Sequence, residues 1–181
     1  SGSNIMLLGL VIGAMMAIDM GGPFNKAAYV FATAALTEGN AAPITAAMIG
    51  GMIPPLAIAT AMLIFRRKFT KEQRGSIVPN YVMGLSFITE GAIPFAAADP
   101  LRVIPSMMVG SGVAGAIALG LGSSIKAPYG GIFVIVGTDF NHILQTLIAL
   151  VVGTLVSALI YGFLKPKVTD NEIQASQAMD E

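Results

Sequence analysis

The chain has 181 residues, of which 55% are hydrophobic and 11% charged, with a net charge of zero and no cysteine. Soluble globular domains carry about 25% charged residues, so this chain has too little polar surface to fold in water. Its hydrophobicity also excludes a disordered protein, and its zero net charge argues against a nucleic-acid partner. Without cysteine, these residues contain no disulfide, thiolate metal site or cysteine phosphoryl carrier. The composition therefore indicates a membrane protein.

The first apolar segment, residues 5–18, is uncharged but shorter than the roughly 20 residues that a membrane-spanning helix needs. It has no basic leader and no small-residue cleavage site, so we do not expect a signal peptide. We expect instead that the chain is the C-terminal portion of a longer membrane protein, and that its first residues belong to a helix whose earlier turns precede this sequence.

A Gly-Gly-Pro turn at residues 21–23 precedes Asn25 and Lys26, which open a short helix. The N-terminal end of a helix presents unpaired N–H groups that can bind hydroxyl-rich or anionic ligands. The alternative is a loop at the lipid surface in which Lys26 pairs with Asp19. The residues do not decide between these two readings.

Long apolar segments predict three membrane-spanning helices. Residues 41–65 and 143–164 contain no charged side chain, and residues 103–122 form a softer span rich in small residues. Glycines let helices approach closely in lipid, so we expect this third span to pack against protein through Gly110, Gly112, Gly115 and Gly120.

Three further apolar segments are interrupted by Gly or Pro, and the longest of them also contains Glu90, so none has an uninterrupted apolar run long enough to span. Such segments are typical of re-entrant or interfacial structure, and in transporters discontinuous segments build the substrate site. The segments are residues 27–36, 77–98 and 127–137.

The basic residues predict the orientation. Half of them lie in the loop at residues 66–74, and Lys165 and Lys167 follow the last span. The positive-inside rule places both groups in the cytoplasm, and two spans separate them. We interpret residues 66–74 as an ordinary positively charged cytoplasmic loop. The alternative is that this loop contacts a partner protein or anionic lipid. We expect residues 1–167 to form the membrane domain and residues 168–181 a polar, disordered cytoplasmic tail.

Glu90 is the strongest candidate for chemistry. It lies in GLSFITEGAIPF, residues 84–95, between Gly and Pro residues that break a helix. A carboxylate at membrane depth costs about 2.5–3.5 kcal/mol and normally faces a cavity on a substrate or proton path. The alternative is a loop at the membrane interface, where this cost vanishes. We favour the cavity because no other charge lies next to Glu90.

The remaining polar residues give weaker indications of function. Asp99 and Arg102 flank Pro100 and favour an interfacial turn with a mutual ion pair. His142 has no cluster of metal ligands around it, so we expect a loop histidine and no metal site. Tyr129 could stack on a sugar ring or anchor the chain at the interface.

Three motifs carry a family resemblance: GAMMAIDMGGPFNKAA at residues 13–28, GLSFITEGAIPFAAADPLRVIPS at 84–106 and APYGGIFV at 127–134. Together they closely resemble enzyme IIC, the membrane component of bacterial phosphotransferase-system (PTS) permeases, of the fructose type and the wider glucose superfamily. The resemblance covers residues 5–165. It implies an all-α membrane protein, with polytopic transmembrane helices and re-entrant hairpins, that forms homodimers in the cell membrane.

The resemblance also implies residue roles. Glu90 would be the principal sugar ligand and catalytic base, Thr89 and Gly91 would shape the hairpin, and Asn25 and Lys26 would line the same cavity. In the family, a IIB partner supplies the phosphoryl group from a cysteine, after IIA, HPr and enzyme I have carried it from phosphoenolpyruvate. No cofactor is implied.

We therefore expect the membrane component of a protein-phosphohistidine–fructose phosphotransferase, without a phosphorylation site of its own. It would bind a hexose, with fructose the first expectation, and move it inward while IIB phosphorylates it. One alternative is an ion-coupled secondary sugar transporter without phosphorylation, in which Glu90 carries a proton. Another is a membrane assembly or channel subunit. Tyr129 departs from the family pattern, in which many relatives have histidine.

Overall fold

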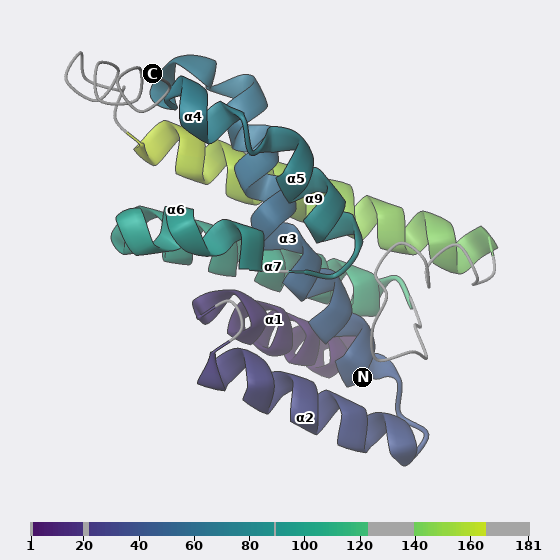
Figure 1. Cartoon of the computed structure of the whole chain (residues 1–181). Helices are drawn as coiled ribbons and strands as arrows, with labels where there is room; N and C mark the ends of the chain where they lie inside the picture. Colours follow the sequence, from purple (N-terminus) through teal and green to yellow (C-terminus); the bar gives the residue numbers. More distant parts are fainter. Residues whose placement is uncertain (1, 20–21, 89, 123–139, 166–181) are drawn as a thin grey trace.

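The computed structural model describes residues 2–19, 22–88, 90–122 and 140–165, and in these ranges it contains helices and no strand (Figure 1). This confirms the all-α prediction. Thr89, Tyr129, residues 127–137 and the tail at 168–181 lie outside the described residues. In chain order the elements are α1 Gly2–Ile18, α2 Pro23–Thr37, α3 Ala42–Ile64, η1 Arg66–Lys68, α4 Lys71–Arg74, α5 Ile77–Leu85, η2 Glu90–Ala92, α6 Ile93–Ala98, α7 Pro100–Gly120 and α9 Phe140–Leu164.

Three of the described helices are long and apolar enough to cross a membrane: α3, α7 and the part of α9 at Ile143–Leu164. They confirm the three predicted spans. Helices α7 and α9 each begin three residues before the predicted boundary, α7 at Pro100 and α9 at Phe140. Proline suits the first turn of a helix, where no N–H donor is needed, so α7 includes Arg102 and not only the apolar run.

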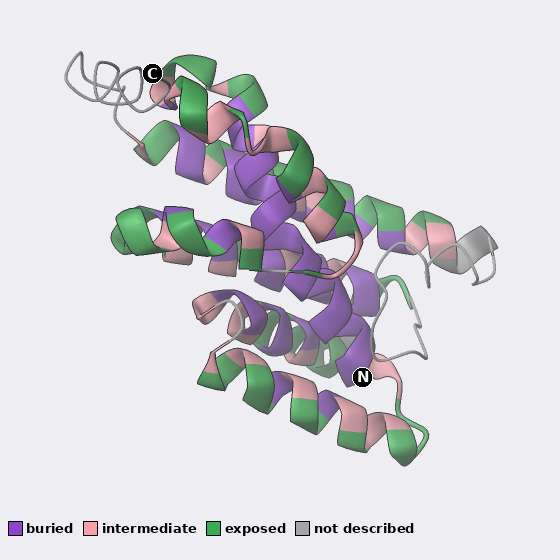
Figure 2. Cartoon of the chain, viewed as in Figure 1, coloured by how far each residue is buried: buried purple, intermediate pink, exposed green. Residues whose placement is uncertain are grey.

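The core of the molecule is α3. Nearly all of its residues between Pro43 and Met62 are buried, and Figure 2 shows it as the buried element through the centre. It packs against α1, α2, α5, α7 and α9. A helix that is apolar all round is typical of such a central position.

Small residues bring α7 close to its neighbours, as predicted. A Cβ atom added to Gly115 would overlap the carbonyl oxygen of Gly9 in α1, and one added to Gly110 would overlap the hydroxyl of Ser157 in α9. Hydrogen bonds between helices accompany this packing. The Ser111 hydroxyl donates to the Gly50 carbonyl in α3 at 2.9 Å.

The segment between α4 and α7 folds back on itself as a hairpin. Helices α5, with 9 residues, and α6, with 6 residues, are about 14 Å and about 9 Å long, far short of the roughly 30 Å hydrocarbon core. Thr70, before α5, and Asp99, after α6, line one recess of about 380 Å³. The chain therefore leaves and returns to the same end of the molecule, as a re-entrant hairpin over residues 77–98 requires; its position in the membrane stays a prediction.

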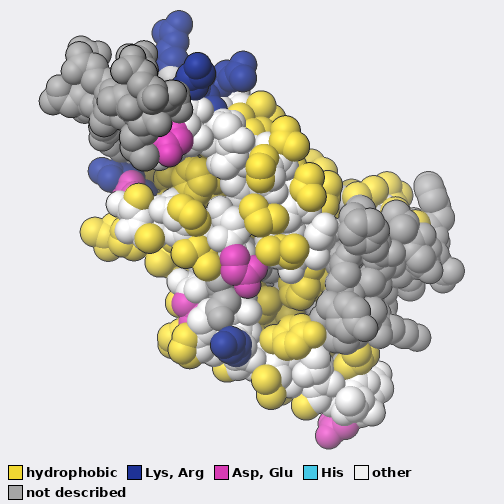
Figure 3. All heavy atoms as spheres, viewed as in Figure 1, with side chains coloured by type: hydrophobic (Ala, Val, Ile, Leu, Met, Phe, Trp, Pro, Cys, Tyr) yellow, Lys and Arg dark blue, Asp and Glu magenta, His cyan; other side chains and the backbone are white. Residues whose placement is uncertain are grey.

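The described residues of the two predicted basic groups lie at this same end; Lys167 is outside the described residues. The Lys68 ammonium donates to the Gly162 carbonyl at 2.6 Å, and the Lys165 ammonium lies 5.1 Å from the centre of the Phe69 ring. Figure 3 shows Lys and Arg side chains gathered at this end, above a largely hydrophobic surface. The charge pattern thus matches the prediction that both groups face one side of the membrane.

Candidate functional site

The first motif forms a tight connection between α1 and α2. The Asp19 carboxylate accepts hydrogen bonds from the backbone N–H groups of Phe24, at 2.7 Å, and Asn25, at 3.1 Å. Helix N-termini leave such donors unpaired unless a side chain caps them. A carboxylate of the chain itself therefore occupies the helix end at which a ligand was expected.

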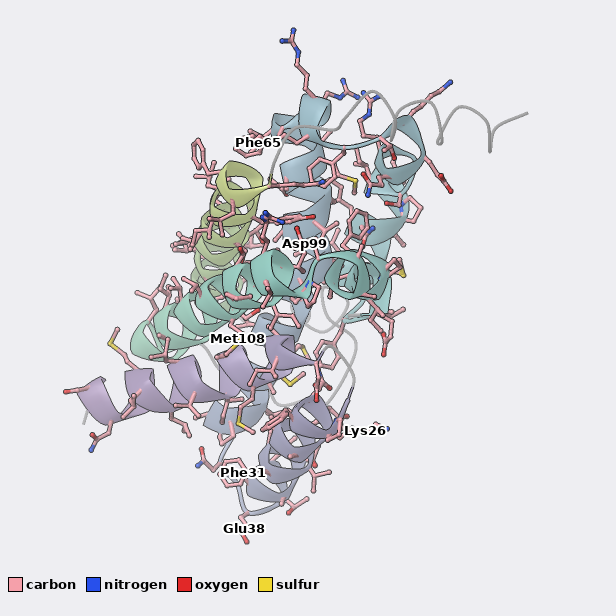
Figure 4. The ribbon with its side chains drawn as sticks, turned by 90° about the vertical axis from the view of Figure 1, so that its left-hand side faces the viewer. Lys26, Phe31, Glu38, Phe65, Asp99 and Met108 are labelled. Atoms are coloured by element: carbon pink, nitrogen blue, oxygen red, sulfur yellow. The ribbon has the colours of Figure 1, made fainter. Side chains whose placement is uncertain are left out.

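Asn25 and Lys26 have different environments. The Asn25 amide donates to the Met16 carbonyl at 3.0 Å, which fastens α2 to α1. Lys26 is exposed, and Figure 4 shows it at the outer edge of the start of α2. Lys26 forms no ion pair with Asp19, nor with any other acid in the described ranges, so the alternative reading of a Lys26–Asp19 pair is wrong.

The second motif begins with a sharp turn after α5. Phe87 has a φ of +65°, a left-handed conformation that is uncommon for a non-glycine residue. Its ring packs 6.5 Å, centre to centre, from that of Tyr29 in α2 and so close to Gly51 in α3 that a Cβ there would lie 2.6 Å from it. These contacts hold the strained backbone and lead the chain into η2.

Glu90 lies at the apex of the hairpin, as the first residue of η2. Between Glu90 and Asp99 the chain forms the three residues of η2 and the six residues of α6. Their combined length along the helix axes is at most about 15 Å, half of the roughly 30 Å hydrocarbon core. The residue is exposed on the surface of the described chain. We expected a sheltered niche around it; in the described residues Glu90 instead lies on the outer surface and lines none of three recesses found there.

The fold brings the two motifs side by side. Ile18 and Asp19, at the end of α1, face the hairpin helix α6 across an apolar recess of about 220 Å³. Phe87 and Tyr29 make a second contact between the motifs. The residues lining the recess are Ile18, Asp19, Ile93, Ala96, Ala97 and Ile104.

Gly91 packs inward, against α5. A Cβ atom at Gly91 would lie 2.6 Å from the amide oxygen of Asn80 and 2.5 Å from the Met83 methyl group. Sequence reasoning missed Asn80, which is 1% exposed. The signal that could have found it is a polar side chain within an apolar segment, directly after Pro79.

Asp99 and Arg102 form the predicted ion pair, at 3.0 Å, between partly exposed side chains. The pair lines the 380 Å³ recess together with Tyr161 and Lys165 from the end of α9. Sequence reasoning did not connect these residues, because Tyr161 and Lys165 are about 60 positions away from the ion pair in the chain.

Comparison with known proteins gives a consistent picture. Residues 1–110 match the family model described as "Phosphotransferase system, EIIC". The chain is 52% identical over 170 residues to the "PTS system fructose-specific EIIB'BC component" of Xanthomonas campestris, and 52% identical over 167 residues to the "PTS system fructose-specific EIIABC component" of Bacillus subtilis. It is 50% identical over 167 residues to the "Fructose permease IIC component" of Bacillus amyloliquefaciens.

These alignments cover 92–93% of this chain but only part of each relative: 29% of the Xanthomonas protein, 26% of the Bacillus subtilis protein and 54% of the Bacillus amyloliquefaciens protein. The chain therefore spans about a quarter to about half of their length. No solved structure matches the chain significantly.

Proposed function

The chain belongs to the phosphotransferase system EIIC family, and on this premise we propose that it is part of a multi-pass permease of the cell membrane that takes up fructose by group translocation. The observation that carries the proposal is the identity of 50–52%, over more than nine tenths of the chain, to proteins named fructose-specific PTS components or fructose permease. The three helices that can span a membrane agree with it.

Glu90 is the sugar ligand and catalytic base in this proposal. Its position at the turn between the two short hairpin helices, in a segment that we expect to be re-entrant, supports the assignment. A carboxylate at membrane depth normally faces a wet cavity or another part of the protein, so the exposed side of Glu90 is where the walls of the site belong. Thr89 and Gly91 shape the hairpin on either side of it.

The chemistry is one phosphoryl transfer. The sugar hydroxyl oxygen forms a bond to phosphorus as the bond between phosphorus and the cysteine sulfur of IIB breaks, and Glu90 takes the hydroxyl proton. Hydrogen bonds from sugar hydroxyls to buried polar groups provide selectivity, because an apolar competitor would leave those groups unpaired.

Asn25 and Lys26 complete the sugar site from α2. The contact of Phe87 with Tyr29 and the recess between Asp19 and α6 support their proximity to the hairpin. Asn25 already donates to Met16, so its amide oxygen is the atom we assign to a sugar hydroxyl. Lys26 brings an exposed ammonium group that can pair with a developing phosphate charge.

The partners follow from the same proposal. IIB docks at the end that carries residues 66–74, which the positive-inside rule makes cytoplasmic. IIB receives its phosphoryl group from IIA and HPr, and the permease works as a homodimer. The names of two relatives combine EIIB and EIIC parts, which supports a IIB partner. The phosphoryl-carrying cysteine lies outside these residues, which contain none.

The test is uptake of labelled fructose into vesicles that contain the complete permease with IIB and a source of phosphoenolpyruvate. The wild type should deliver fructose phosphate. Glu90→Gln should lower the rate by about 100-fold or more, because a general base contributes at least that factor, with normal membrane insertion. Glu38→Gln is the matched control: Glu38 is exposed at the far end of α2 (Figure 4) and should leave the rate unchanged.

Two outcomes would refute the proposal. Free fructose that accumulates inside and is released by an uncoupler would identify an ion-coupled transporter, an alternative that none of the comparisons supports. Near-normal phosphorylation by Glu90→Gln would remove Glu90 from the chemistry while leaving the family assignment in place.

A further inference from the structure

Asn80, in the first helix of the hairpin, is a buried amide with one unpaired atom. Its nitrogen donates to the Ser76 carbonyl oxygen at 3.0 Å and to the Ser76 hydroxyl at 3.3 Å. Its oxygen is fully buried and accepts no hydrogen bond. Buried polar atoms in proteins are nearly always paired, so an exception calls for an explanation.

The unpaired oxygen faces the backbone next to Glu90. A Cβ atom at Gly91 would lie 2.6 Å from it, closer than side chains approach in folded proteins. The other near atom, the Met83 methyl at 2.5 Å, ends a flexible side chain and can move. The Asn80 amide cannot move easily, because both of its bonds to Ser76 hold it. The Asn80 oxygen therefore makes glycine necessary at position 91.

We propose that Asn80 is a positioning residue, whose fixed amide oxygen sets how closely the backbone at Gly91 approaches α5 and thereby aims the Glu90 carboxylate at the sugar. Glu90 and Gly91 are consecutive residues of the same short turn η2, so a shift of one backbone unit moves the other. This inference rests on the proposed role of Glu90 in sugar phosphorylation.

The contact makes a specific prediction about pairs of substitutions. Asn80→Ala removes the amide oxygen against which the turn packs, and kcat/KM for sugar phosphorylation should fall at least tenfold. Gly91→Ala forces the turn η2 away from the Asn80 amide and should lower kcat/KM further. In the double variant the new methyl group fits into the space that Asn80 vacates, so N80A/G91A should be more active than Gly91→Ala alone.

The experiment measures phosphoenolpyruvate-dependent sugar phosphorylation by the complete permease with IIB, together with the thermal stability of each purified variant. Asn40→Ala is the matched control, because Asn40 is exposed between α2 and α3 and should leave kcat/KM unchanged. Equal losses in Gly91→Ala and the double variant, or wild-type kcat/KM in Asn80→Ala, would overturn the proposal.

The readouts separate this inference from the proposed function. A wild-type permease that makes no sugar phosphate would refute the function, and with it the role of Asn80 in aiming Glu90. The contact of Asn80 with Gly91 could still be detected by thermal stability, which should fall in Gly91→Ala and be partly regained in the double variant. Normal sugar phosphorylation without any coupling between the two positions would refute only the role of Asn80.

Discussion

Helix α7 packs on α9 so closely that one added methyl group should destabilise the protein. Gly110 faces Ser157 and Gly153 of α9. A Cβ atom at Gly110 would overlap the Ser157 hydroxyl and would lie 2.7 Å from the Ser157 Cβ and 2.5 Å from the Gly153 carbonyl oxygen. The Ser157 hydroxyl meanwhile donates to the Ser106 carbonyl at 2.8 Å. Gly110→Ala must therefore either separate the helices or turn Ser157 away from its acceptor.

The size of the effect follows from these distances. Carbon atoms in contact lie about 3.5–4.0 Å apart, so the 2.7 Å approach requires a shift of about 1 Å. Overpacking of this kind costs about 1–3 kcal/mol, and a hydrogen bond between membrane helices contributes about 0.6 kcal/mol. We expect Gly110→Ala to lower the free energy of unfolding by about 2–3 kcal/mol, before any gain from the better helix propensity of alanine.

The assay is unfolding of the complete permease by SDS in mixed micelles, with Gly120→Ala as the matched control on the same helix. A Cβ at Gly120 would lie 3.1 Å from the Cγ of Met6, a flexible side chain that can yield. Helix propensity favours alanine by about 1 kcal/mol within a helix and by less at Gly120, the last residue of α7, so propensity alone would make Gly110→Ala the more stable of the two and a loss of stability in it reports the packing. If Gly110→Ala is as stable as Gly120→Ala, the close packing of α7 on α9 is wrong.

Two further predictions use the same unfolding assay. Ser111→Ala removes the hydrogen bond to the Gly50 carbonyl and should lower the free energy of unfolding by about 0.6 kcal/mol, the average for such bonds in membrane proteins; a gain in stability would contradict the bond. Asp99→Asn breaks a partly exposed ion pair with Arg102 and should change stability by less than about 1 kcal/mol; a much larger loss would show that the pair is structurally essential.

Local patterns were enough to predict the main elements. The three spans follow from uninterrupted apolar length, which depends only on neighbouring residues, and the hairpin follows from Gly and Pro on both sides of Glu90. The ion pair of Asp99 with Arg102 was predictable because residues three apart share one turn of a helix. The small residues of α7 likewise indicated close helix packing, although not with which helices.

The site depended on contacts between distant segments. Residue spacing could not predict three contacts: the hydrogen bonds of Asp19 to the α2 N-terminus, the packing of Phe87 on Tyr29, and the approach of the Asn80 amide to Gly91.

The physical reason lies in the apolar solvent. In water, an amphipathic stripe shows which face of a helix turns inward. Helices that are apolar on every side have no amphipathic stripe. Their sequence therefore predicts that a helix is present, but not which of its faces contacts a neighbouring helix. Small residues and single hydrogen bonds choose the neighbours, and those choices become visible only when the helices are packed together in three dimensions.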